Sequence, residues 1–149
     1  MAIYVGGTGD ANKFDDYEEG TWNPAIKGGT TAGSYNASGE GFYIKTGRQV
    51  FCWLNAKGTT SGASGPTQIH GLPFTSAANT SANAGTAVYS AGSCQYWAGY
   101  GSSDILGALV TNSSTKMYFH CDDGSSTGSN LSVANGGHNA HVFVCYFTD

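Results

Sequence analysis

Two segments of the sequence carry apolar side chains on both faces of an alternating pattern, and they restrict the fold more than any other feature. Successive side chains of a β-strand point to opposite faces of the sheet. In residues 49–56 the two faces consist of Val50, Cys52, Leu54 and Ala56, and of Phe51 and Trp53. In residues 138–147 they consist of His141, Phe143, Cys145 and Phe147, and of Val142, Val144 and Tyr146. A strand of this kind is covered on both sides in the finished protein.

The rest of the chain is typical of short strands separated by glycine-rich turns. Its 149 residues suit one domain, include 23 glycines and are only 11% charged. Ten residues in a row with an uninterrupted helical period do not occur. Further strands are predicted at residues 22–27, 42–45, 67–70, 86–89, 93–98, 105–111 and 115–121. Polar loops are predicted at 28–41 and 122–130, a turn with an apolar plug at 71–74, and a hairpin turn at 112–114. We expect an all-β fold, an antiparallel β-sandwich with jelly-roll topology.

Two strands with two apolar faces are more than the core of one sandwich needs. A monomer would leave one of these faces as a large exposed patch, which soluble monomers avoid. We therefore expect the sheet to line an interface between subunits.

The first residues are predicted to form an arm, residues 1–21, ahead of a β-sandwich domain at residues 22–149. Glycine-rich residues 6–10 interrupt a short strand candidate at residues 3–5. The arm ends in an acidic junction with Asp15, Asp16, Glu18 and Glu19, four of the ten carboxylates of the chain. Two interpretations stay open: a solvated acidic turn, or docking against a neighbouring subunit or another protein.

Three motifs in a fixed order give the chain a family resemblance. The first combines IYVGGTG at residues 3–9 with DDYEEGTWNP at 15–24, the second is GFYIKTGRQV at 41–50, and the third is IHGLPFTS at 69–76. Together they resemble structural proteins of tailed bacteriophages, commonly tail fibres, in which the acidic junction precedes a C-terminal β module. The resemblance covers the first half of the chain.

The resemblance implies a virion structural protein, made in the host cytoplasm and assembled as a homotrimer. The preferred role is a tail-fibre or receptor-binding tip module that contacts a host surface glycan or receptor. The alternative is a trimeric head decoration protein, a cement or knob protein on the capsid surface. Attachment to other virion proteins is expected through the arm and junction, at Tyr4, Phe14, Asp15, Asp16, Tyr17, Glu18, Glu19 and Trp22.

Charge and hydropathy argue against two classes of partner. The net charge is −4 with only six lysines and arginines, so no basic stripe exists for nucleic acid or an anionic membrane surface. The chain has no run of about 20 apolar residues, so no membrane insertion is expected, and no secretory signal is visible. The four cysteines form no C-x-x-C pair, and we favour free, mostly buried thiols: Cys52, Cys94, Cys121 and Cys145.

No set of residues indicates catalysis. Glycosidases hold two carboxyl groups about 5–9 Å apart across a cleft, and sequence neighbours such as Asp122 and Asp123 meet this only by accident. His141 and Cys145 share a strand face but lie about 13 Å apart, too far to bind one metal ion. We expect no enzyme activity, no metal and no cofactor. Two exceptions stay open: Ca²⁺ bound by residues 122–124, and copies of the histidine and cysteine side chains converging on a threefold axis.

The segment QYWAGYG, at residues 95–101, is the best recognition candidate. Aromatic faces with nearby amide and hydroxyl groups suit sugar binding, and aromatic residues are also favoured at protein interfaces. Contacts with a receptor or glycan are predicted at Tyr96, Trp97 and Tyr100. The alternative is that these side chains pack in the core or in a subunit interface.

Overall fold

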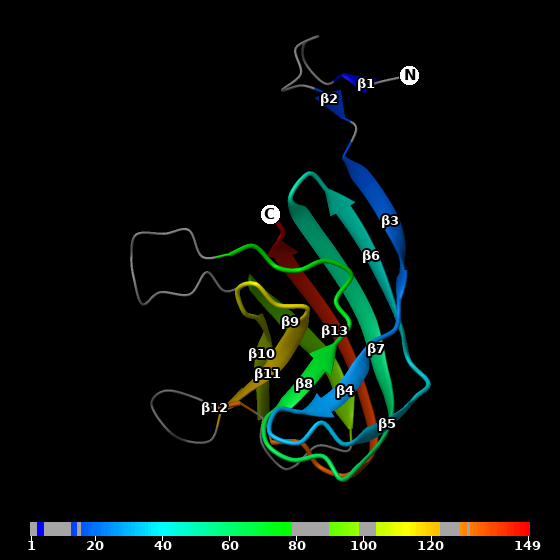
Figure 1. Cartoon of the computed structure of the whole chain (residues 1–149), viewed down its shortest axis with the longest axis vertical. Helices are drawn as coiled ribbons and strands as arrows, with labels where there is room; N and C mark the ends of the chain where they lie inside the picture. Colours follow the sequence, from blue (N-terminus) through cyan, green and yellow to red (C-terminus); the bar gives the residue numbers. More distant parts are fainter. Residues whose placement is uncertain are drawn as a thin grey trace.

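The computed structural model describes residues 3–4, 13–14, 16–78, 90–98, 104–122, 129–130 and 132–149. Every regular element within these ranges is a β-strand (Figure 1). In chain order the strands are β1 (Ile3–Tyr4), β2 (Lys13–Phe14), β3 (Tyr17–Trp22), β4 (Ala25–Gly28), β5 (Ser34–Ala37), β6 (Glu40–Thr46), β7 (Gln49–Ser61), β8 (Thr67–His70), β9 (Ser90–Ala98), β10 (Asp104–Val110), β11 (Lys116–Asp122), β12 (Ser129–Asn130) and β13 (Gly136–Phe147).

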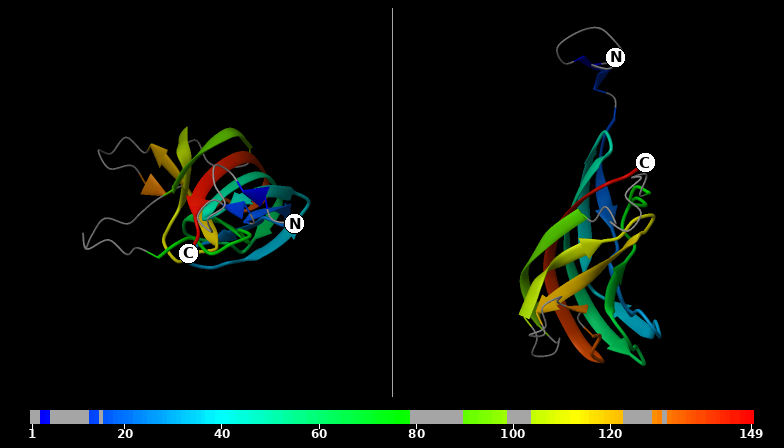
Figure 2. Two further views of the ribbon diagram at one scale, coloured as in Figure 1. Left: turned by 90° about the horizontal axis from the view of Figure 1, so that it is seen from above. Right: turned by 90° about the vertical axis from the view of Figure 1, so that its left-hand side faces the viewer.

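Strands β3 to β13 form one 11-stranded sheet among the described residues. Its order is β3-β6-β7-β13-β9-β10-β11-β8-β4, with β5 beside β7 and β12 beside β11, and every pairing is antiparallel. Figure 2 shows the sheet curling around its own interior. Strands β1 and β2 pair with each other in a separate two-stranded sheet.

The predicted all-β, antiparallel fold is confirmed, but its division into two packed sheets is not what the structure has. The hydrogen-bonded path runs from β3 to β4 without a break, and the jelly-roll topology is not confirmed. The physical reason is that a sandwich and a curled sheet both bury one side of each strand, so they share the same alternating pattern.

Asn23 and Pro24 carry the chain from one edge of the main sheet to the other. Strand β3 is one edge and pairs with β6, whereas β4 is the opposite edge and pairs with β8. Pro24 is fully buried between them and cannot donate to a strand ladder, because it lacks a backbone N–H. The single strand predicted at residues 22–27 is therefore divided between the two edges, and β3 already begins at Tyr17.

The two segments with two apolar faces form β7 and β13, which pair from Gln49–Phe147 to Thr60–Gly136. Their inward positions are buried and form one side of the core: Val50, Cys52, Leu54, Ala56, Ala140, Val142, Val144 and Tyr146. The other half of the curled sheet completes the core with Ile26, Ile69, Met117 and Phe119.

The segment at residues 71–78 links the start of β11 to the end of β13, two strands that are not neighbours in the sheet. The backbone N–H groups of Leu72 and Ala77 donate to the carbonyl oxygens of Thr115 and Phe147. The Tyr146 hydroxyl donates to the Phe74 carbonyl at 3.0 Å and accepts from the Phe74 N–H at 3.2 Å. Leu72 is buried in the core, so the predicted turn with an apolar plug is confirmed.

Most of the remaining strand predictions are confirmed as well. The segments predicted at 42–45, 67–70, 93–98, 105–111 and 115–121 lie in or overlap β6, β8, β9, β10 and β11. Strand β5 falls within the predicted polar loop at 28–41, where it pairs with the end of β7. The strand predicted at 86–89 lies outside the described residues.

Candidate interaction surface

The outward side of the central strands carries a row-by-row arrangement of apolar side chains. These residues alternate along β6, β7 and β13 with the residues that enter the core. The Cα pairing aligns Ile44, Phe51 and Cys145 in one row, and Phe42, Trp53 and Phe143 in the next. These six residues are termed here the outer aromatic face.

The aromatic rings of the outer aromatic face are in contact with one another. The ring centroids of Trp53 and Phe143 lie 5.3 Å apart, those of Phe42 and Trp53 5.9 Å, and those of Phe51 and Phe143 6.4 Å. Such spacings are favoured for aromatic pairs. Phe42 and Trp53 are nevertheless 42% and 43% exposed. Contiguous exposed apolar patches are typical of interaction surfaces, so this face is the candidate surface of the chain.

A groove of about 720 Å³ lies at one end of the outer aromatic face. Its apolar lining includes Phe42, Trp53 and Phe143, and its polar lining includes Thr21, Glu40, Asn55, Ser93, Gln95 and His141. Glu40, Asn55 and His141 are Cα neighbours in a single row across β6, β7 and β13. The Asn55 Oδ1 atom is buried and has no hydrogen-bond partner among the described residues.

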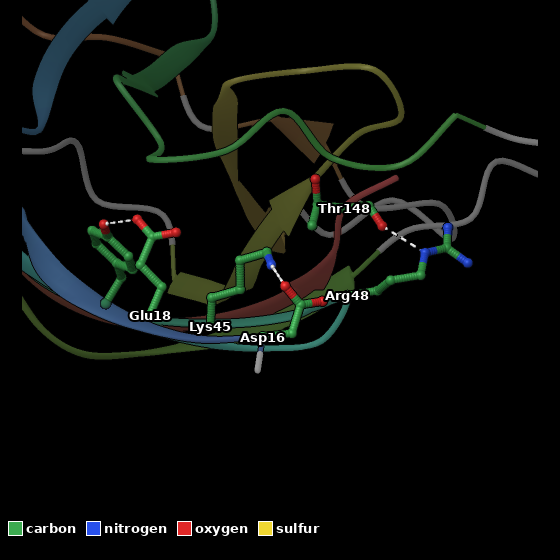
Figure 3. Close-up of polar contacts among 6 residues, drawn as sticks. Asp16, Glu18, Lys45, Arg48 and Thr148 are labelled. Atoms are coloured by element: carbon green, nitrogen blue, oxygen red, sulfur yellow. Dashed lines mark hydrogen bonds and ion pairs between the residues drawn. The ribbon is translucent and has the colours of Figure 1, made fainter. Parts of the chain in front are cut away.

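The acidic junction leads into the edge strand β3 and is held to β6 by polar contacts (Figure 3). Lys45 Nζ lies 3.3 Å from Asp16 Oδ1, and the Tyr43 hydroxyl donates to Glu18 Oε1 at 2.7 Å. This hydrogen bond to Glu18 is the main cause that raises the pKa of Tyr43. Arg48 Nε donates to the Thr148 carbonyl at 2.9 Å, which ties the β6–β7 turn to the end of the chain (Figure 3).

The predicted attachment residues fall into four groups. Asp16, Tyr17, Glu18 and Glu19 are exposed at the start of β3. Trp22 is only 8% exposed and belongs to the core, where a glycine at position 41 leaves room for its indole ring. Tyr4 lies in β1 and Phe14 in β2, paired through Ile3–Phe14 and Tyr4–Lys13. Asp15 lies outside the described residues.

The three predicted recognition residues do not share one surface. Tyr96 is 48% exposed, and its ring centroid lies 5.2 Å from that of His141, next to the groove. Trp97 points to the opposite face of β9 and packs against the core, because neighbouring residues of a strand alternate between faces. Tyr100 lies outside the described residues. The structure thus places Tyr96 beside His141, in the row that continues through Asn55 to Glu40. Glu40, Asn55 and Gln95, which line the groove, were not predicted as contacts.

Titratable side chains do not assemble into a metal-binding cluster within the described ranges. His138 is buried, and its Nε2 atom donates to Thr60 Oγ1 at 2.8 Å, because the Thr60 hydroxyl in turn donates to the Ala134 carbonyl. Burial lowers the pKa of His138. The predicted candidates His141 and Cys145 lie outward on β13, away from His138, and Asp123 lies outside the described residues.

The cysteines behave as small side chains of the sheet. Cys52 and Cys121 are buried in the core, and Cys94 and Cys145 are partly buried. Burial raises the pKa of the Cys52 thiol to about 12, which keeps it protonated and unreactive near neutral pH.

Among the described residues there is no helix with the length and hydropathy needed to cross a membrane. The fold is that of a curled antiparallel sheet that wraps around its own core and exposes aromatic side chains on its outer face.

No family model and no curated protein matches the chain. Among solved structures, the chain is similar to the crystal structure of the Dettilon tailspike protein (gp208), with a TM-score of 0.60 and 17% sequence identity. The match covers 86% of this chain and 23% of the tailspike chain. The chain therefore spans less than a quarter of that tailspike, and the similarity is one of fold.

Proposed function

We propose that this chain is a non-enzymatic structural module of a bacteriophage tail, and that the outer aromatic face is the surface through which it assembles. The observation that carries the proposal is the exposure of Phe42 and Trp53, 42% and 43%, on a sheet that already has a complete core. An exposed apolar patch with a polar rim is typical of a surface that is covered in the assembled protein.

The fold similarity to a tailspike supports the tail as the location. It gives no support to the alternative of a head decoration protein on the capsid surface. The resemblance of the acidic junction to tail-fibre proteins points the same way. Among the described residues that line the groove, Glu40 is the one carboxylate, so the groove lacks the pair of carboxyl groups that glycosidases use.

A role as a receptor-binding tip is a second candidate, and it is favoured by Tyr96. This side chain is 48% exposed beside the groove and adjoins His141. An exposed aromatic ring beside a groove that is lined by amide and carboxylate side chains suits contact with a host surface glycan. Tyr96→Ala should then lower adsorption of phage to host cells, and Tyr118→Ala, an aromatic substitution on the other half of the sheet, should leave adsorption unchanged.

Electron microscopy of phage particles treated with a gold-labelled antibody against this chain tests the proposed location. Label on the tail is the expected result. Label on the capsid surface would instead establish the decoration role, and unlabelled particles would refute a virion protein. Removal of residues 1–15, which leaves β3 intact, should abolish the label if the arm attaches the module, while the purified domain stays folded.

A further inference from the structure

The outer surface around the aromatic face has the dimensions of a protein interface. From β3 to β9 it spans five strands, about 20 Å wide and, over the length of β6, about 23 Å long, given strand spacings near 4.8 Å and a rise near 3.3 Å per residue. This corresponds to roughly 450 Å² in projection, before the relief of the side chains is added. A specific interface buries about 800 Å² on each partner, so this surface can form the centre of one.

The composition of this surface follows the same plan as a protein interface. None of the six residues of the outer aromatic face is charged. Charged and polar side chains surround them, including Glu19, Glu40, Asn55, Ser93 and His141. Interfaces between proteins combine an apolar centre depleted of charge with a polar rim, and tryptophan is enriched among the residues that dominate their affinity.

The β6 side and the β13 side of this surface carry complementary side chains in the same row of the sheet. One row runs from Glu40 on β6 through Asn55 on β7 to His141 on β13. A rotation axis parallel to β7 and β13 keeps heights equal and brings the β6 side of one copy against the β13 side of the next. A carboxylate then meets an imidazole, and by the same register the side of Phe42 and Ile44 meets the side of Phe143 and Cys145.

We infer that the outer aromatic face binds a second copy of this chain, related by rotation about an axis parallel to β7 and β13, with Glu40 of each copy against His141 of the next. The inference rests on the proposed function, in which this face is the assembly surface, and it names the partner. Both side chains are exposed, and neither has an ion-pair partner in the part of the chain that the structure describes. The pair adds a charge-assisted hydrogen bond at the rim, whereas a reversed copy would place Glu40 at the height of the opposite end of β6.

Disulfide cross-linking of a Glu40→Cys/His141→Cys variant, in a Cys94→Ser/Cys145→Ser background, tests this interface. Within one chain the two positions are separated by β7, so their Cα atoms lie about 9.6 Å apart, beyond the limit of about 7 Å for a disulfide. Any bond between them must therefore join two copies. We expect mild oxidation to convert the double variant into covalent oligomers, whereas each single variant stays unlinked.

A matched control places two cysteines in the same relation on the other half of the sheet. Lys27 on β4 and Tyr118 on β11 flank Gln68 on β8 in one row, and Lys27→Cys/Tyr118→Cys should remain unlinked under the same oxidation. Linking of this control to the same extent would show random collision and overturn the inference.

Three other results would also overturn it, and they are separable from the location of the protein in the virion. If light scattering shows an oligomer but the Glu40→Cys/His141→Cys variant stays unlinked, the interface lies elsewhere. Linking of the His141→Cys single variant would indicate a different symmetry. If the chain is a monomer, and host polysaccharide changes the fluorescence of the wild-type chain but not that of Trp53→Phe, the groove is a glycan site. None of these results alters where the antibody label lies, so the tail assignment is judged independently.

Discussion

Replacing Tyr146 by phenylalanine removes the hydroxyl that binds residues 71–78 to the core. This hydroxyl makes two hydrogen bonds to the backbone of Phe74, at 3.0 and 3.2 Å, from a fully buried side chain. Burial raises the pKa of Tyr146, so the hydroxyl stays a donor at every practical pH. Each bond contributes about 1 kcal/mol to stability, and leaving the Phe74 backbone groups without partners adds a desolvation cost. We expect the variant to lose about 2–3 kcal/mol.

Thermal unfolding at a fixed protein concentration measures the effect, because the stability of an oligomer depends on concentration. For a chain of this size about 1 kcal/mol corresponds to roughly 2–4 °C, so the melting temperature should fall by about 4–12 °C. Tyr43→Phe is the matched control: it removes the hydroxyl that binds Glu18 at the exposed edge, and it should cost less than about 0.5 kcal/mol. Equal melting temperatures for the two variants would refute the claim that Tyr146 fixes this segment.

Three further predictions concern the backbone, pH and assembly. Gly39→Ala should destabilise the chain by about 1–3 kcal/mol in denaturant titrations, because a Cβ there would lie 1.9 Å from the Asn55 carbonyl oxygen, whereas Gly137→Ala, with nothing within 4 Å, should cost much less. Because burial lowers the pKa of His138, the unfolded chain binds the proton first. The contribution of His138 to stability should therefore be constant above the ordinary histidine range near pH 6.5, and stability should fall as the pH drops below it, less so in His138→Gln. Trp53→Ser should weaken self-association by about 30-fold or more in sedimentation equilibrium, with the fold unchanged by circular dichroism; an unchanged dissociation constant would remove Trp53 from the interface.

The two-faced strands made much of the fold accessible from sequence. Alternation along residues 49–56 identifies both the core positions of β7 and the outward pair Phe51 and Trp53. The crossing of the chain from one sheet edge to the other at Pro24 could not be predicted from the sequence. A proline at the start of a strand and a proline between two strands that pair with different partners look the same locally. For the same reason the alternating pattern could not separate a sandwich from a curled sheet.

The candidate surface was only partly predictable. Tyr96 and Trp97 were grouped because they are neighbours in the chain, yet the strand sends them to opposite faces. Glu40 was missed because it comes beside Asn55 and His141 only through the register of three strands, and register is set by long-range pairing that a single sequence does not contain. The sequence held one signal for this part of the surface: Asn55 follows Trp53 on the outward side of β7, which places it on the same face.

The mass of the intact chain in solution, measured by light scattering at micromolar concentration, tests most directly whether the outer aromatic face is covered by other copies. The expected result is the mass of three chains, reduced toward that of one chain by Trp53→Ser. A wild-type chain with the mass of a monomer would contradict the assignment of this face as an assembly surface.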